Sequence, residues 1–228
     1  MSTLITYKIV SDEGGRVKEA ARTACNFWNK FIEPRKSVVV RLGVFSEDSG
    51  TIAQAYEPHA GPKGLVYGRV DFNTKYLLKF PNLKTAGTIV HEIGHTLGIG
   101  WEKWMTLYDE RTGEFLAKSV GKLPALAKMR VELDGGDGTA FSHWDEETFG
   151  RELMTGYQDR AEHVLPVTVG VMSLLGHRVR NPLNRKTSLA KLLRESAVVT
   201  FTRKAQAKAL DLDHFQATPL WETVPHRR

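Results

Sequence analysis

One motif constrains this chain more than any other feature: His91-Glu92-Ile93-Gly94-His95-Thr96-Leu97-Gly98. In a helix, residues four positions apart lie on the same face, so His91 and His95 can bind one metal ion together. Glu92 lies about 100° round the helix from His91, because a helix has about 3.6 residues per turn. It can therefore reach a water molecule on the metal rather than the metal itself.

The residues on either side of this His-Glu-x-x-His motif favour a helix. Residues 85–90 are typical of a buried helix that leads into the motif, and Gly98 and Gly100 are suited to end it. Neutral imidazole suits Zn²⁺, and two helical ligands leave positions open for a third ligand and a water. We therefore expect a zinc site whose third ligand comes from elsewhere in the chain.

The composition permits one good-sized domain, or two subdomains round a cleft. The chain has 228 residues, of which 41% are hydrophobic, so we expect a real core. No apolar run reaches the roughly 18 residues that a membrane span needs. The first seven residues lack the charged and apolar regions of a signal peptide, which leaves a cytoplasmic location and export by a non-classical route both open. Cys25 is the only cysteine and lies on an apolar helical stripe, so we expect a packed core thiol.

Alternating apolar and polar residues predict an N-terminal mixed sheet with two helices. We expect strands at residues 4–10, 37–45, 51–56 and 65–72, and a first helix at residues 15–31. The strand at residues 65–72 comes directly before the motif helix. We expect it to border the cleft and to pair with an extended substrate backbone.

The segment after Gly100 contains turn signals rather than long periodic elements. A hairpin is expected at residues 108–115, a short helix within residues 122–131 that begins near Pro124, and a tight turn at residues 134–139. An EF-hand loop needs a longer set of spaced oxygen ligands than this turn offers, so calcium there stays open.

The third zinc ligand is missing from its usual place. In metzincins the motif continues to a third histidine three residues past its glycine, but here Trp101 holds that position and indole cannot ligate zinc. A carboxylate ligand, as in thermolysin-like enzymes, would make Glu146 or Glu147 the candidates. The remaining histidines are His59, His143, His163, His177, His214 and His226.

Two later segments resemble the leishmanolysin family of metzincins, in which an insertion separates the helix motif from the third histidine. They are Ser142-His143-Trp144-Asp145 and Glu152-Leu153-Met154-Thr155-Gly156. The family usually has a glutamate where this chain has Asp145, and it follows the histidine with a methionine turn at the spacing seen here. The resemblance covers residues 85–180, and the N-terminal third matches only in its order of elements.

This resemblance implies an α+β zincin fold with a twisted mixed sheet, an active-site helix and a smaller C-terminal subdomain that carries the Met-turn. Residues 1–180 would form the catalytic domain, with the cleft between residues 1–100 and 101–180. The family pattern makes His91, His95 and His143 the zinc ligands and Glu92 the general base. Met154 would form an apolar floor under the metal. Tyr157 would help to stabilise the oxyanion, although in some metzincins that tyrosine follows the methionine by two residues rather than three. With its single cysteine and short insertion, the chain would be a shortened, cysteine-poor version.

The function expected from these features is zinc-dependent endopeptidase activity on protein or peptide substrates. One alternative is a zinc-containing but proteolytically silent structural or binding protein, such as a phage or secretion component. Glu92 argues against it, because a purely structural site does not need a general base.

A second alternative is nucleic-acid or anionic-surface binding through the C-terminal extension, residues 181–228. The net charge is +6 and this part of the chain is rich in lysine and arginine, although a solvated basic face is the simpler interpretation. Within it we expect an amphipathic helix at residues 187–196, with Leu189, Leu192 and Leu193 on one side, and an extended stretch at residues 198–201.

Overall fold

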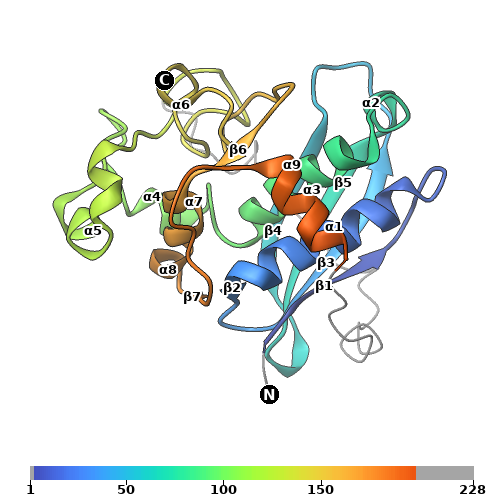
Figure 1. Ribbon diagram of the computed structural model, residues 1–228, viewed down its shortest axis with the longest axis horizontal. Coiled ribbons are helices and arrows are strands. Elements are labelled where there is room, and N and C mark those ends of the chain that lie inside the picture. The colour runs from blue at the N-terminus through green and yellow to red at the C-terminus, as the bar shows by residue number, and fades with distance from the viewer. Residues whose placement is uncertain (1–2, 199–228) are drawn as a thin grey trace.

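A four-stranded mixed sheet forms the N-terminal part of the computed structural model, which describes residues 3–198 (Figure 1). Its strand order is β1-β3-β5-β4. Strands β1 (Ile5–Ile9), β3 (Val38–Phe45) and β5 (Val66–Asn73) run parallel, and β4 (Ala53–Ala60) runs antiparallel to β5. The four predicted strands are therefore confirmed, and the third extends further than expected.

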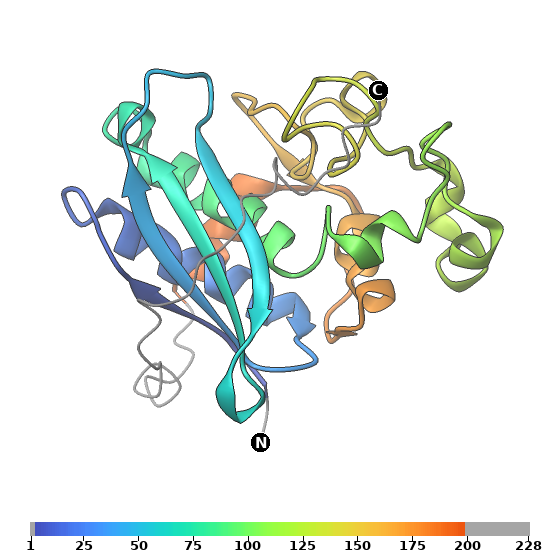
Figure 2. The same cartoon turned by 180° about the vertical axis from the view of Figure 1, so that it is seen from behind.

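The order of the strands corrects one expectation. The strand predicted at residues 65–72 is β5, which pairs with β3 on one side and β4 on the other. Both of its backbone edges are used, so it cannot accept a substrate strand. The edge strand on that side is β4, because the chain runs from β3 to β4 first and then returns to place β5 between them. Figure 2 shows this edge of the sheet from behind.

Two helices cover one face of the sheet, and a third packs against those two (Figure 1). Helix α1 (Arg16–Phe31) packs against β1 and against α3 (Asn82–Thr96), the helix that carries the motif. The fully buried indole of Trp28 on α1 donates a hydrogen bond of 2.9 Å to the Val90 carbonyl oxygen on α3. Cys25 is buried in this core, as its position on the apolar stripe predicted.

The third helix comes from the predicted C-terminal extension. Helix α9 (Leu189–Ala197) confirms the amphipathic helix expected at residues 187–196, and it packs against α1 and α3. Leu189, Leu192 and Leu193 are buried. Most of the stretch expected at residues 198–201, His214, His226 and the basic residues beyond Val198 lie outside the described residues.

Beyond Gly100, short helices, bridges and turns form the second part of the structure. The hairpin predicted at residues 108–115 is confirmed by a bridge between Tyr108 and Phe115. The predicted short helix is a 3₁₀ helix, Pro124–Lys128. Strand β7 (Arg178–Val179) pairs with β2 (Ile32–Glu33), which follows α1, and so joins the two parts. The remaining elements are 3₁₀ helix Pro62–Gly64, α2 (Thr74–Leu77), α4 (Glu102–Met105), α5 (Ala117–Lys122), α6 (Glu146–Phe149), β6 (His163–Val164), α7 (Pro166–Gly170), α8 (Met172–Leu175) and β8 (Thr187–Ser188).

Within residues 3–198, no helix combines the length and the apolar character that crossing a membrane requires.

The edge at β1 is closed by a side chain rather than by another strand. Asn29 on α1 accepts a hydrogen bond from the Ile5 N–H at 2.8 Å and donates one to the Ile5 carbonyl oxygen at 2.7 Å. Both residues are buried. The amide therefore replaces a neighbouring strand for the two backbone groups of Ile5.

Replacing this amide tests its role in the fold. We expect Asn29→Leu to lower the free energy of unfolding by about 2–5 kcal/mol, because two buried backbone groups would each lose a partner at about 1–3 kcal/mol. Urea denaturation measures this difference. Asn82→Ala is the matched control, since Asn82 is exposed, and it should stay within about 0.5 kcal/mol of the parent. Equal losses in the two variants would contradict the prediction.

Candidate metal centre

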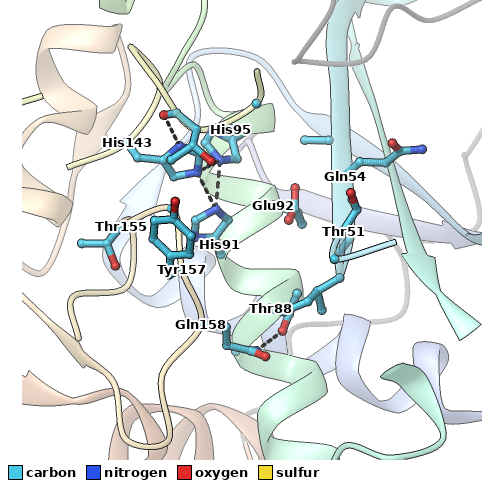
Figure 3. Close-up of a pocket in the computed structure, with 18 of the residues that line it drawn as sticks. Thr51, Gln54, Thr88, His91, Glu92, His95, His143, Thr155, Tyr157 and Gln158 are labelled. Atoms are coloured by element: carbon cyan, nitrogen blue, oxygen red, sulfur yellow. Dashed lines mark hydrogen bonds between the residues drawn. The ribbon is translucent and has the colours of Figure 1, made fainter. Parts of the chain in front are cut away.

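Three histidine side chains converge at the cleft (Figure 3). His91 and His95 lie one turn apart on α3, and His143 comes from the loop before α6. The Nε2 atoms are 3.0 Å apart for His91 and His95, 3.1 Å for His91 and His143, and 3.2 Å for His95 and His143. His95 and His143 are buried, whereas His91 is partly exposed. The structure thus brings together the three histidines that the sequence reasoning selected.

Backbone carbonyl groups determine the tautomer of all three rings. The Nδ1 atoms lie 2.7 Å from the Leu153 oxygen for His91, 3.0 Å from the Ile99 oxygen for His95, and 2.9 Å from the Thr139 oxygen for His143. A carbonyl oxygen only accepts, so each Nδ1 carries the hydrogen and donates it. Burial lowers the pKa of His91 to about 4 and that of His143 to about 3, which keeps these two rings neutral. Each Nε2 atom then offers a lone pair.

Three lone pairs that point at one another fit a bound cation. The short distances between the Nε2 atoms are not hydrogen bonds, because none of these atoms carries a hydrogen in this tautomer. Two nitrogens bound to one tetrahedral zinc ion at about 2.0–2.1 Å would lie about 3.4 Å apart, a few tenths of an ångström more than here. Imidazole ligands suit Zn²⁺, Cu²⁺, Fe²⁺ or Ni²⁺ rather than calcium. The donor set therefore fits a transition-metal ion.

The other ligand candidates lie elsewhere. In the described part of the chain, no second group of three ligating side chains is close enough to hold a metal ion, which includes the turn at residues 134–139 where calcium was left open. Glu146 and Glu147 lie in the first turn of α6 and do not belong to the histidine group. His59 on β4, His163 on β6 and His177 after α8 do not belong to it either.

Trp101, which replaces the usual third histidine, fastens the end of the motif helix instead. Gly98 has a φ of 118°, a value that side-chain-bearing residues rarely adopt, and it reverses the chain after α3. The Ile99 carbonyl oxygen thereby meets His95, and the Trp101 indole donates a hydrogen bond of 2.7 Å to the His95 carbonyl oxygen. The residue that breaks the motif thus stabilises the orientation of its second histidine.

His143 is presented by a backbone ladder. The Glu132 N–H donates to the His143 carbonyl oxygen at 3.0 Å, and the Trp144 N–H donates to the Met154 carbonyl oxygen at 2.9 Å. Trp144 is fully buried and packs against the rings of Trp104 and Phe115. These contacts hold the segment on both sides and direct the His143 ring toward α3.

Met154 packs against the motif helix at Gly94, next to His95 in sequence. Its side chain is fully buried, and a Cβ atom added at Gly94 would lie only 2.8 Å from the Met154 Sδ atom. Gly94 therefore permits the close approach of the methionine to α3 between the two histidines. The carbonyl oxygen that orients His91 belongs to the preceding residue, Leu153.

Glu152 organises this turn, a role that the sequence did not reveal. Its side chain is buried and accepts hydrogen bonds from the Met154 N–H at 2.7 Å, the Leu165 N–H at 3.0 Å and the Thr168 hydroxyl at 2.7 Å. The Thr168 oxygen also accepts a hydrogen bond from the Trp144 indole at 3.0 Å. Burial raises the pKa of Glu152 to about 7, and these hydrogen bonds oppose the increase. The network joins the Met154 turn to the His143 segment.

A cleft of about 870 Å³ opens beside the three histidines. Helix α3 runs along the middle of the cleft, with β4 and the residues before it on one side and the segment that carries Thr155 and Tyr157 on the other, as Figure 3 shows. The buried carboxylate of Glu92 lies between the histidines and β4. Burial raises its pKa to about 8, and a backbone hydrogen bond from Ala55 on β4 opposes the increase. Tyr157 lines the cleft with a side chain that is 55% exposed.

His143→Ala tests the assignment of the third ligand. We expect it to weaken metal binding about 100-fold or more, because one of the three protein ligands that share the binding free energy, roughly 10–16 kcal/mol for structural zinc sites, would be lost. Competition between the protein and a chromophoric chelator for Zn²⁺ measures the affinity. Glu146→Ala and Glu147→Ala should bind as the parent does. A loss confined to one of these glutamate variants would show that a carboxylate is the third ligand.

Glu152→Leu tests the network beneath the site. Three buried donors would lose their acceptor, so we expect the free energy of unfolding to fall by about 3–5 kcal/mol. Chemical denaturation of the metal-free protein isolates this effect from metal binding. The control is Glu147→Leu, at an exposed position, which should change the stability by about 0.5 kcal/mol or less. Unchanged stability in Glu152→Leu would show that the network contributes nothing.

Comparisons with known proteins add no family to this geometry. No family model matches the chain, and no curated protein matches it significantly. The description of the site therefore depends on three converging imidazoles, a buried carboxylate beside them and the open cleft that they line.

Proposed function

We propose that this chain is a zinc-dependent endopeptidase with a leishmanolysin-like metzincin core. The observation that carries the proposal is the convergence of three neutral imidazoles beside the Glu92 carboxylate, in an open cleft of about 870 Å³. The mixed sheet, the motif helix and the buried methionine that packs against this helix at Gly94 agree with that core.

His91, His95 and His143 would hold the zinc ion. When bound, zinc lowers the pKa of a water ligand toward about 7 and polarises the carbonyl group of the substrate. The backbone carbonyl groups of Leu153, Ile99 and Thr139 keep the three rings in the binding tautomer. The protein thus presents the ligands already oriented.

Glu92 is the proton carrier in this proposal. It lies next to His91 in sequence but faces the cleft, between the histidines and β4 (Figure 3). From this position it takes a proton from the attacking water and delivers it to the nitrogen of the leaving amine, first as a base and then as an acid. A site that only stores a metal has no use for a buried carboxylate that does not bind the ion. Glu92 therefore favours catalysis over a silent zinc protein.

The sheet edge supplies a place for the substrate backbone. Residues 51–55, at the start of β4, line the cleft, and within residues 3–198 β4 pairs only with β5. An extended peptide can add to such an edge through main-chain hydrogen bonds. Because Ala55 also contacts the Glu92 carboxylate, a peptide on this edge would pass beside the proton carrier.

Tyr157 completes the proposed machinery. Its exposed side chain lines the cleft on the side opposite β4, close to the histidines in Figure 3. A phenol is a good donor to a developing oxyanion. We assign Tyr157 this role, with the offset of three residues from Met154 as the difference from the family pattern.

Glu92→Gln separates catalysis from metal binding. We expect the zinc-loaded parent to cleave unfolded casein and the variant to lose a factor of about 10²–10⁴ in rate, because general acid–base catalysis contributes about that much. The zinc content of the two proteins should be equal.

The exposed acid Glu147 provides the control, and Glu147→Gln should cleave as the parent does. Removal of zinc with a chelator should stop cleavage, and added zinc should restore it. Equal cleavage by the parent and Glu92→Gln would indicate a contaminating protease. No cleavage by either would reject the proposed activity on this substrate and favour a zinc protein that does not cut.

A further inference from the structure

A polar pocket lies in the cleft one helical turn before His91. It is formed by Thr88 on α3 and by Gln158 and Glu162, which follow the Met154 turn. A helix rises about 4.5 Å over the three residues from Thr88 to His91, so the pocket is close to the candidate metal site. Gly87 lies beside the pocket, because a Cβ atom at that position would be in ordinary van der Waals contact with the Glu162 Oε2 atom, at 3.6 Å.

The Gln158 side chain presents an unsatisfied acceptor. The Thr88 hydroxyl donates to the Lys84 carbonyl oxygen at 3.2 Å and accepts from the Gln158 Nε2 atom at 2.5 Å (Figure 3). This chain of hydrogen bonds orients the amide, because a carbonyl oxygen cannot donate. The Gln158 Oε1 atom is left buried with no partner among the described residues. A buried acceptor of this kind costs free energy until a donor reaches it.

The Glu162 carboxylate is the second acceptor. Its Oε1 atom accepts one long hydrogen bond from the Asp159 N–H, 3.3 Å, and no ion pair to it occurs in the described part of the chain. Lys84 is the nearby cation, but its Nζ atom lies 4.5 Å above the Phe80 ring. Burial raises the pKa of Glu162 to about 7; Lys84 opposes the increase, whereas the charges of Asp159 and Glu152 add to it. A cation in the pocket would offset this cost.

Helix α9 fixes the backbone of Glu162. The Leu189 N–H at the start of α9 donates to the Glu162 backbone carbonyl oxygen at 3.0 Å. The Leu189 and Leu193 side chains pack beside Gly87, where a Cβ atom would meet them at 3.1 and 3.8 Å. The pocket therefore has an apolar back wall and acceptor groups toward the cleft.

We propose that Thr88, Gln158 and Glu162 form a specificity pocket for a lysine or arginine side chain of the substrate, on a residue adjacent to the scissile bond. This inference depends on the proposed protease activity for its biological meaning. A basic side chain brings donors and positive charge to both acceptors. An apolar side chain would bury them without partners, at about 1–3 kcal/mol each, and an acidic one would be repelled. The substrates inferred are thus unfolded or extended segments that carry basic residues.

Matched peptides test the pocket through binding, independently of cleavage. The probe is a fluorescein-labelled alanine heptapeptide with lysine, norleucine or glutamate at its centre, and the protein is the zinc-loaded Glu92→Gln variant. We expect the lysine peptide to bind about tenfold more tightly than the norleucine peptide in fluorescence anisotropy, and the glutamate peptide to bind most weakly. Adding Glu162→Gln should reduce the lysine preference to about twofold or less, and Gln158→Glu should increase it.

Glu47→Gln is the matched control, because Glu47 also lines the cleft but is exposed. It should keep the lysine preference. Thermal unfolding and zinc content confirm that each variant is folded and loaded. The proposed pocket is rejected if the Glu92→Gln protein shows no preference for the lysine peptide. It is also rejected if the preference persists after Glu162→Gln is added.

Cleavage of the same peptides by the protein with Glu92 intact distinguishes the two proposals. Cleavage that favours lysine, with the preference lost in Glu162→Gln, supports both the pocket and the protease. Lysine-selective binding without cleavage of any peptide would support the pocket and reject the protease. Cleavage that ignores the central residue would support the protease and reject the pocket.

Discussion

The convergence of three imidazole nitrogens is the constraint on which the rest of this structure depends. Neutral rings can point their lone pairs at one place only if each Nδ1–H has its own acceptor, and here every acceptor is a backbone carbonyl group. The three carbonyl groups come from the Met154 turn, the reversal after α3 and the loop before His143. Each of these segments must therefore hold its place for the metal site to form.

Buried polar groups provide that rigidity. Glu152 gathers donors from the Met154 turn and from α7, and Thr168 passes the connection on to Trp144, next to His143. At the other end of the site, Trp101 ties down the end of α3 through the His95 carbonyl oxygen. Satisfied networks of this kind fix one arrangement, because an unpaired buried donor or acceptor is costly. The three histidines and Met154 are thus held by one connected network.

Different segments of the chain line the cleft and supply different groups to it. Helix α3 carries two of the three histidines and Glu92, β4 offers a backbone edge, and the segment after Met154 supplies Tyr157 and the acceptors of the polar pocket. Helix α9 supports that last segment although it comes from the C-terminal region of the chain. In our proposals, chemistry is centred on the histidines and recognition is placed one helical turn away.

The sequence by itself determined the elements that depend on local periodicity. The spacing of His91 and His95, the position of Glu92 between them and the alternation in the strands follow from backbone geometry within one element. The sequence also limited the candidates for the third zinc ligand. Trp101 occupies the position where metzincins have their third histidine, and the resemblance of residues 142–156 to one family pointed to His143.

Only the tertiary structure decided which distant groups meet. It placed β4 rather than β5 at the edge of the sheet. The position of a strand in the sheet depends on how the connecting segments pack, and it need not follow the order of the strands along the chain. It buried Glu152 and gave this carboxylate hydrogen-bond donors from distant segments, and it placed the Glu162 carboxylate beside Gly87. Local sequence patterns predicted neither contact. Local hydrogen bonding shapes helices and strands, whereas these approaches arise from the packing of segments far apart in the chain.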